Sequence, residues 1–276
     1  MNVLLLGHKG MLGSALAREL SKHELTGWDR SDIDITKSET TKRVVEEKPD
    51  LVINAAAFTD VDACETRYEE ARAVNALGVQ NIAQACTQLG IPIVHISTDY
   101  VFDGESQEGY AENDQLSPLN KYGASKAEGE RLLQQTTDKF YLIRSSSLFG
   151  PNGKNFVDTI LQKAEKGEVL SIIEDQVMKP TYSVDLARAI VSLIEDKADY
   201  GTYHLTNEGS VSWYDFAVIF LKIAALSVGV KPVSASQYPR PAKRPRCSIL
   251  NNTKRPPLRH WSDAVTEYIR RRSGSK

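Results

Sequence analysis

The sequence predicts an α/β fold, with a Rossmann-type parallel sheet, helices on both faces and a smaller C-terminal lobe. Short apolar runs alternate with longer helical patterns up to about residue 150. A glycine-rich turn follows the first of these runs directly. Beyond residue 150 the elements shorten and loops rich in proline separate them. Alternating strands and helices form βαβ units around a parallel sheet, so we expect two parts, residues 1–150 and, for the most part, 151–276, with some later segments returning to the sheet.

In the first part, each expected strand is a short apolar run, and each expected helix has apolar residues at three- or four-residue steps. Leu12, Leu16 and Leu20 show this spacing, while Pro49 and Gly90 end the second and third helices. The expected strands cover residues 3–6, 25–29, 50–56, 93–98 and 140–146. The expected helices cover residues 11–23, 38–48, 64–89 and 121–135.

The second part is predicted in the same way, with less regular spacing. The expected strands cover residues 169–173 and 201–206. The expected helices cover residues 155–167, 184–196, 214–226 and 262–276. Between the last two helices, residues 238–257 contain many of the prolines of the chain. We expect this stretch to be an ordered surface loop.

Composition excludes several classes of function. The chain has 276 residues, with 34 Lys and Arg against 36 Asp and Glu. This near-neutral balance argues against nucleic acid or an anionic membrane as a partner. No apolar run is long enough to cross a membrane, and the apolar run at the N-terminus is too short for a signal peptide. Cys64, Cys86 and Cys247 are scattered, as in a reduced cytoplasmic protein without disulfides or a metal site.

The glycine turn points to a dinucleotide. Gly7, Gly10 and Gly13 form a GxxGxxG pattern between the first strand and the first helix, where backbone N–H groups can face a pyrophosphate. Asp29 follows about twenty residues later and can bond the ribose hydroxyls of NADH, whereas the neighbouring Arg30 can accept the 2′-phosphate of NADPH. We expect a nicotinamide cofactor and leave the choice open, with a preference for NADPH as the usual reductive donor.

Tyr122, Lys126 and Thr98 suggest acid–base chemistry. Tyr122 and Lys126 stand four residues apart and share one face of a helix. An ammonium group beside a phenol lowers the pKa of the phenol, which prepares the tyrosine to exchange a proton with a substrate oxygen. Thr98 ends the fourth strand and faces the cleft where ligands bind, so its hydroxyl can polarise a carbonyl. Together these residues predict reduction of a carbonyl group.

Motifs along nearly the whole chain resemble a known family. GxxGxxG, NAAAFTDVD, ISTDYVFDG and YGASKAEGE occur in the order typical of the extended short-chain dehydrogenase/reductases. STDYVFDG, PTY, GTYHLTN and RPRCSIL resemble, more narrowly, the dTDP-4-dehydrorhamnose reductase family. The resemblance implies NAD(P)H-dependent reduction of the 4-keto group of dTDP-4-dehydro-L-rhamnose to dTDP-L-rhamnose, for surface polysaccharide synthesis.

The resemblance also implies roles for individual residues. The catalytic residues would be Thr98, Tyr122 and Lys126. The cofactor contacts would be Gly7, Gly10, Met11, Leu12, Asp29, Arg30, Asp34, Ile35, Ala55, Ala56, Ala57, Thr59, Tyr122 and Lys126. The substrate contacts would be Val61, Asp62, Thr98, Asp99 and Ser147. Ser147 stands where family members usually have Trp, which leaves the preferred sugar open.

Two other functions remain compatible with the sequence. The chain could be an epimerase, a dehydratase or a reductase acting on another nucleotide-sugar. Dehydratases usually have Asp-Glu after the threonine, whereas Thr98 is followed here by Asp99 and Tyr100, which favours simple reduction. The chain could also be a regulatory subunit that binds NADP without catalysis, although the intact Thr, Tyr and Lys set favours an enzyme. The apolar faces of the helices at residues 64–89 and 121–135 could pair two copies into a homodimer.

Overall fold

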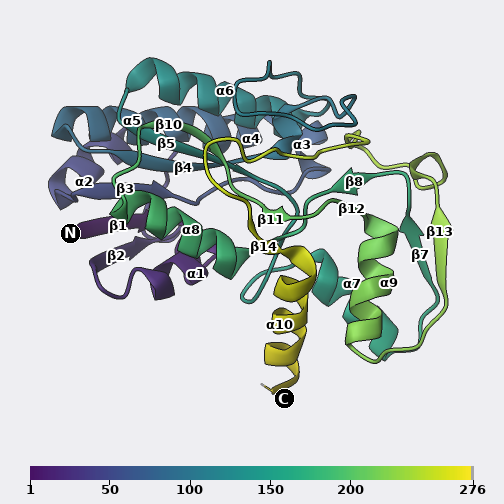
Figure 1. The fold of residues 1–276 in the computed structure, drawn as a ribbon. Coiled ribbons are helices and arrows are strands. Elements are labelled where there is room, and N and C mark those ends of the chain that lie inside the picture. The colour runs from purple at the N-terminus through teal and green to yellow at the C-terminus, as the bar shows by residue number, and fades with distance from the viewer. Residues whose placement is uncertain (275–276) are drawn as a thin grey trace.

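The computed structural model describes residues 1–274, which form a central sheet with helices on both faces and a group of smaller elements at one end (Figure 1). All strand pairs in the six-stranded sheet are parallel. In spatial order the strands are β10 (Gly201–His204), β5 (Phe140–Ser145), β4 (Ile93–Thr98), β3 (Leu51–Asn54), β1 (Asn2–Leu6) and β2 (Glu24–Trp28). The predicted fold class is therefore confirmed.

The strand order creates a crevice at the carboxyl ends of β1 and β3. The chain passes from β1 to the edge strand β2 and then crosses back to β3 on the other side of β1. In open α/β sheets, ligands bind outside the carboxyl ends of the strands at such a reversal. The position of the binding site is thus set by the topology.

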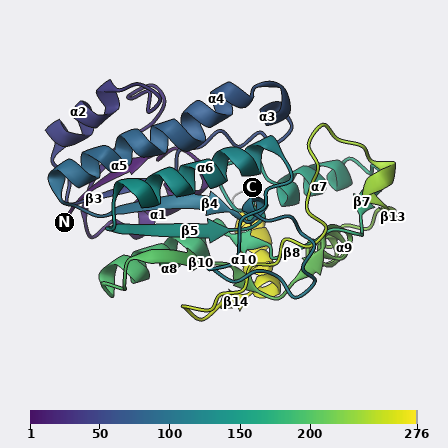
Figure 2. The same cartoon turned by 90° about the horizontal axis from the view of Figure 1, so that it is seen from above.

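Helices cover both faces of the sheet (Figures 1 and 2). One face carries α1 (Met11–Glu19) and α8 (Ser183–Glu195), and the other carries α2 (Glu39–Glu47), α5 (Gly78–Leu89) and α6 (Lys121–Thr136). Successive residues of a strand point to opposite faces. Accordingly, Val3 and Leu5 of β1 pack in the cluster that contains α1, whereas Leu4 and Leu6 pack in the cluster that contains α5.

The helix expected over residues 64–89 is broken, so that prediction is wrong. The stretch forms α3 (Ala63–Thr66), α4 (Tyr68–Arg72), a π-helical turn (Ala73–Leu77) and α5. The π-helical turn contains Asn75, which is fully buried and bonds the backbone of Phe58. Apolar spacing alone cannot reveal a widened turn that is shaped around one polar side chain.

The C-terminal lobe combines three helices with short strand pairs. The helices are α7 (Phe156–Glu165), α9 (Trp213–Ile223) and α10 (Trp261–Gly274). The strand pairs are β6 (Leu148–Phe149) with β9 (Thr181–Tyr182), β7 (Leu170–Ile173) with β13 (Val230–Val233), β8 (Val177–Met178) with β12 (Val211–Ser212), and β11 (Asn207–Glu208) with β14 (Leu258–His260). The C-terminal helix was expected to reach Lys276, but residues 275 and 276 lie outside the described part.

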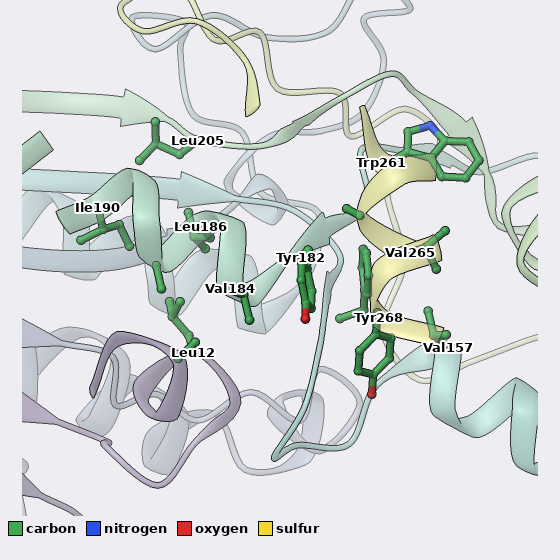
Figure 3. Packing of buried hydrophobic residues seen from close by; sticks show 14 of the residues in the cluster. Leu12, Val157, Tyr182, Val184, Leu186, Ile190, Leu205, Trp261, Val265 and Tyr268 are labelled. Carbon is green, nitrogen blue, oxygen red and sulfur yellow. The ribbon is translucent and has the colours of Figure 1, made fainter. Parts of the chain in front are cut away.

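One hydrophobic core connects the sheet to this lobe. Figure 3 shows Leu12 of α1 and Leu186 of α8 in the same cluster as Tyr182, Trp261 and Tyr268 of the lobe. Because β10 also belongs to the sheet, the chain crosses between the two parts more than once. The division of the chain near residue 150 stays a prediction.

The segment 238–257 is ordered but does not lie only on the surface. Ala242, Cys247 and Leu250 are all buried. Leu250 packs with Phe102 and Tyr110 in a small hydrophobic cluster of its own. The segment therefore wraps onto the sheet part of the molecule, which corrects the expected surface loop. No helix among the described residues is long and apolar enough to cross a membrane.

Candidate functional site

The glycine turn joins β1 to α1 at the reversal of the strand order. Gly7 has a φ of +79°, and a Cβ atom there would lie 2.9 Å from the backbone nitrogen of Ala56. A side chain at Gly13 would collide with the carbonyl group of Gly7. α1 begins without a side-chain cap and without an acidic residue in its first turn. Its first N–H groups are thus available to an anion, and the turn fits a pyrophosphate.

A cavity of about 310 Å³ opens beside this turn. The predicted cofactor residues that line it are Gly7, Asp29, Arg30, Asp34, Ile35, Ala56 and Ala57. Those that do not line it are Gly10, Met11, Leu12, Ala55, Thr59, Tyr122 and Lys126. Leu12 packs its side chain into the core, so only its backbone can face a ligand.

The cavity also has walls that sequence reasoning missed. These residues are Leu6, Ile33, Thr36, Phe58, Glu70, Ala73 and Val74. Most of them are apolar, and apart from Phe58, which belongs to the NAAAFTDVD motif, their spacing resembles that of ordinary core residues. Thr36 donates a hydrogen bond of 2.7 Å to Asp34 Oδ1, and this bond lowers the pKa of Asp34. Asp34 is therefore held as a carboxylate at the cavity wall.

Lys9 compensates the charge of Asp29. The Lys9 ammonium pairs with the Asp29 carboxylate, and the hydrogen bond between them raises the pKa of Lys9. Arg30 follows Asp29 and is exposed at the same cavity. With Asp29 paired, this corner of the cavity can accept the additional phosphate of NADPH. His8, Asp29 and Asp32 each bring one possible ligand atom within 4.8 Å of the others, but Lys9 already occupies Asp29 and we assign no metal there.

Two buried asparagines shape the loop that follows β3. The Asn54 Oδ1 atom accepts a hydrogen bond of 3.1 Å from the N–H group of Ala56. Asn75 accepts from the N–H group of Phe58 at 2.8 Å and donates to its carbonyl oxygen at 3.0 Å. Asn75 also donates to Ser125 Oγ, at 3.0 Å. Asn75 thereby links the cavity loop to α6, the helix that carries Tyr122 and Lys126.

Thr98 is held at the carboxyl end of β4. Its hydroxyl accepts a hydrogen bond from the N–H group of Tyr100 at 3.2 Å and donates to Asp99 Oδ1 at 2.9 Å. Asp99 is only 2% exposed and also accepts from Ser146 Oγ at 2.9 Å. Burial raises the pKa of Asp99. The structure thus places Asp99 behind Thr98, where it orients the threonine hydroxyl, although the resemblance implied a substrate contact.

Tyr122 and Lys126 lie in the first two turns of α6. The helix starts after Asn120, whose side chain accepts the N–H group of Gly123 at 2.8 Å. Burial raises the pKa of Tyr122, and a hydrogen bond with Thr98 opposes this shift. The spacing of Tyr122 and Lys126 had led us to expect a lowered pKa for the tyrosine. Among the protein's own groups that expectation is wrong, because burial outweighs every favourable contact.

The amino group of Lys126 faces β4. Lys126 is 1% exposed, and its Nζ atom donates to the carbonyl oxygen of Ile96 at 2.6 Å. The same atom lies 3.3 Å from His95 Nε2. Burial lowers the pKa of Lys126 to about 8. The side chain of His95 is fully buried.

A second cavity, of about 350 Å³, lies in the C-terminal lobe next to Tyr122. Tyr100 lines this cavity, and its ring meets the Tyr122 ring edge-on with centroids 6.0 Å apart. Its lining consists of Tyr100, Phe156, Thr159, Ile160, Lys163, Ser171, Ile172, Ile173, Gln176, Trp213, Tyr238, Arg240 and Arg244. Sequence reasoning missed this set because it comes from separate segments. The only local signals were the STDY and RPRC motifs.

Asp62 anchors the segment 238–246 beside this second cavity. Its carboxylate accepts hydrogen bonds of 2.6 and 2.9 Å from the Arg244 guanidinium and one of 3.2 Å from the N–H group of Ala242. The bond from Arg244 is the main cause that lowers the pKa of Asp62. Asp62 is thus engaged with the protein itself, and Val61 lines neither of the two cavities.

Ser147 follows β5 in an unusual backbone conformation. Its φ of +48° lies in the left-handed region, which costs a non-glycine residue about 1 kcal/mol. Its carbonyl oxygen accepts from the N–H group of Thr181 at 3.3 Å, and its hydroxyl lies 3.4 Å from Ser146 Oγ. Ser147 lines neither cavity.

The predicted residues meet at one edge of the sheet. Gly7, Asp29, Ala55 and Ser147 lie just beyond the carboxyl ends of β1, β2, β3 and β5, and Thr98 is the last residue of β4. This edge holds the cavity beside the glycine turn and the Thr98 hydroxyl, and the phenol of Tyr122 contacts Tyr100 in the wall of the second cavity. Such an arrangement can transfer hydride to a carbonyl group and protonate its oxygen.

Comparisons with known proteins agree with this geometry. A family model described as "RmlD substrate binding domain" matches residues 1–273. A protein named dTDP-4-dehydrorhamnose reductase from Aggregatibacter actinomycetemcomitans is 41% identical over 91% of each chain. The spore coat polysaccharide biosynthesis protein SpsK of Bacillus subtilis is 36% identical over 99% of this chain and 98% of its own.

A solved structure is similar over nearly the whole length. It is dTDP-4-dehydrorhamnose reductase from Bacillus anthracis in complex with NADP, with a TM-score of 0.95 and 35% identity, covering 98% of this chain and 99% of that one. The resemblance drawn from the motifs is thereby confirmed. Since the family model spans nearly every residue and the relatives align from end to end, the chain belongs to the RmlD substrate-binding-domain family.

Proposed function

We propose that this chain is an NADPH-dependent reductase that converts the 4-keto group of dTDP-4-dehydro-L-rhamnose to the hydroxyl group of dTDP-L-rhamnose. The observation that carries this proposal is the hydrogen-bonded contact of Thr98, at the carboxyl end of β4, with Tyr122, whose ring meets Tyr100 in the wall of the second cavity. The names of the relatives and the NADP in the Bacillus anthracis structure support the substrate and the cofactor.

In the proposed reduction, the residues of the chain would have the following roles. NADPH, when bound, supplies the hydride. The glycine turn binds its pyrophosphate, and Lys9 and Arg30 stand where its 2′-phosphate would lie. The one O–H group of Thr98 would turn from Asp99 Oδ1 to the keto oxygen when the substrate binds, and Tyr122 gives that oxygen its proton. The phenol of Tyr122 is protonated near neutral pH, as a general acid must be before it gives up its proton.

The second cavity suits the nucleotide part of the substrate. Phe156 and Trp213 offer aromatic rings, which meet with centroids 4.6 Å apart. Lys163 and Arg240 add positive charge, whereas the Arg244 guanidinium is held by Asp62. Rings can stack on a thymine base, and guanidinium groups bind phosphates in a bidentate manner. We therefore place the deoxythymidine diphosphate in this cavity, with the sugar toward Tyr122.

The first experiment follows the loss of nicotinamide absorbance with dTDP-4-dehydro-L-rhamnose, separately with NADPH and with NADH. Oxidation accompanied by dTDP-L-rhamnose, identified by mass spectrometry and NMR, is the expected result. Formation of a different sugar isomer without net oxidation would point to an epimerase. Cofactor binding without turnover of any nucleotide-sugar would instead support a regulatory subunit.

Location and assembly are further parts of the proposal. We place the reaction in the cytoplasm and its product in surface polysaccharide synthesis, supported by three free thiols and by the name of SpsK. The formal net charge of −2 supports a small-molecule partner rather than nucleic acid. The apolar faces of α5 and α6 pack onto the sheet of their own chain, so a homodimer has no support from them. Light scattering of the purified protein would decide its assembly.

A further inference from the structure

His95 lies in a buried chain of polar groups that ends at Lys126. Asn54, His95 and Lys126 are at most 1% exposed and come from β3, β4 and α6 in turn. The Asn54 Nδ2 atom is 3.2 Å from His95 Nδ1, and His95 Nε2 is 3.3 Å from Lys126 Nζ. Neither the fold nor the proposed proton transfer from Tyr122 requires a histidine here, so the contact calls for an explanation.

The direction of these hydrogen bonds follows from Ala56. The N–H group of Ala56 donates to Asn54 Oδ1 at 3.1 Å, so the NH₂ group of the asparagine must be the part that faces His95. His95 Nδ1 is then an acceptor. Burial holds the pKa of His95 well below its usual value, so the ring is neutral and carries one proton. That proton must sit on Nε2, which points toward Lys126.

This direction makes the contact sensitive to the charge of Lys126. A neutral amine can accept the N–H group of His95 at Nε2 while it donates to the carbonyl oxygen of Ile96 at 2.6 Å. An ammonium group has no lone pair to accept that bond. Protonation of Lys126 therefore requires the ring proton to move to Nδ1, so that Nε2 can accept from the ammonium. The bond from Asn54 is lost in that arrangement.

Among the groups around Lys126, His95 is the one that changes when the amino group of Lys126 is protonated. On its own helix, Glu130 raises the pKa of Lys126, but its carboxylate is already bonded to Ser97 Oγ at 2.5 Å and to Arg144 at 2.7 Å. Tyr122 is the remaining titratable group on that face of α6. From the sheet, β4 contributes His95 and β3 contributes the uncharged Asn54.

We propose that His95, oriented by Asn54, is a positioning residue that fixes the amino group of Lys126, and that the ring tautomer of His95 changes when this amine takes up a proton. The amino group of Lys126, which lies one turn along α6 from Tyr122, thereby has one defined set of hydrogen bonds when it is neutral and another when it is protonated. Because the Asn54 bond is lost when the amine is protonated, the charge of Lys126 and the tautomer of His95 change together.

Nitrogen NMR of protein labelled with ¹⁵N-histidine tests the tautomer directly. On the alkaline side of a midpoint near the Lys126 pKa of about 8, His95 is expected to carry its proton on Nε2, and on the acid side on Nδ1. The Lys126→Met variant should keep the proton on Nε2 throughout. His204 is an internal control, because its Nδ1 faces the carbonyl oxygen of Asn251 at 3.1 Å and should stay protonated. One unchanging tautomer of His95 in the wild-type protein would overturn the proposal.

A kinetic experiment tests whether His95 positions Lys126 for catalysis. This experiment assumes the proposed reduction of the nucleotide-sugar. The His95→Phe variant should lower kcat roughly tenfold, since a misplaced amine costs orientation, and should displace the pH midpoint of kcat. KM for the nucleotide-sugar should stay the same. His95→Gln, whose amide can accept from Asn54 and donate to Lys126, should recover part of the loss. An unchanged pH profile in His95→Phe would contradict the positioning role. If the sugar is not a substrate, only this second experiment fails.

Discussion

Tyr122 is the side chain on which the proposed chemistry depends most. Replacing it with phenylalanine removes the proton donor but keeps the ring that meets Tyr100. We expect Tyr122→Phe to lower kcat by about 10²–10⁴-fold, the usual contribution of general acid catalysis, and to bind NADPH as before. Steady-state kinetics and fluorescence titration of the cofactor measure the two effects. A variant with near wild-type turnover would show that another group supplies the proton.

Arg30 should set the preference between the two cofactors. Asp29 is neutralised by Lys9, so the exposed guanidinium of Arg30 at this cavity is the group that can pair with a 2′-phosphate. In Arg30→Ala we expect KM for NADPH to rise roughly tenfold while KM for NADH hardly changes. Arg131→Ala, which changes an exposed arginine on α6, is the control. An equal rise for both cofactors would contradict a specific phosphate contact.

Some single residues could be identified from the sequence and others could not. The spacing of Tyr122 and Lys126 needs only the geometry of a helix, and Thr98 needs only the end of a strand. The partner of Lys126 could not be found, because His95 stands 31 positions earlier on a different strand. The raised pKa of Tyr122 was missed for a similar reason, since burial depends on elements that the sequence does not place.

The π-helical turn at residues 73–77 holds the cavity loop against α6 through Asn75. Asn75 within it makes bonds to Phe58 and Ser125, and its loss would remove the side-chain partner of the part-buried backbone of Phe58. We expect Asn75→Ala to lower the free energy of unfolding by about 2–3 kcal/mol and to raise KM for NADPH. Urea denaturation and kinetics measure these effects. Gln84→Ala, at an exposed position of α5, should change neither the free energy of unfolding nor KM for NADPH. Equal effects from both variants would contradict the structural role of Asn75.

The sequence predicted elements well where periodicity determines them. The strand at residues 93–98 and the helix beginning at Lys121 match the structure, because an apolar run and an asparagine cap mark them. The continuous helix over residues 64–89 was wrong, because the chain leaves helical geometry at Arg67 and widens into a π-helical turn at residues 73–77, and apolar spacing marks neither feature. The second cavity was missed because its walls come from α7, β7, α9 and the segment 238–246, which only the tertiary fold brings together.

Asp62 connects the two parts of the molecule across the site. It joins the end of the loop after β3 to Arg244 in the segment that borders the second cavity. In Asp62→Asn the charge-assisted bonds weaken and this segment loses its anchor. We expect KM for the nucleotide-sugar to rise about fivefold with KM for NADPH unchanged. Asp60→Asn is a matched control, because Asp60 bonds only the backbone at the start of α3. A rise in both constants would indicate a general loss of structure.

Two buried histidines should make the stability of the whole molecule depend on pH. Burial lowers the pKa of His204 to about 4 and holds that of His95 well below its usual value. In the unfolded chain both take up a proton below about pH 6.5, whereas the folded protein keeps them neutral. The unfolded state thus binds more protons in this range, so stability rises with pH and is lost as the pH falls toward 4.

The expected slope distinguishes this cause from the titration of carboxylates. Two protons correspond to a decrease of up to about 2.7 kcal/mol in the free energy of unfolding per pH unit. Urea denaturation between about pH 5 and about pH 6.5 measures it above the range where most carboxyl groups titrate. His95→Phe removes one of the two groups, so its slope should be about half that of the wild type. A wild-type slope near zero would mean that one or both rings are already charged in the folded protein, and the direction assigned to the bonds between Asn54, His95 and Lys126 would then have to be reversed.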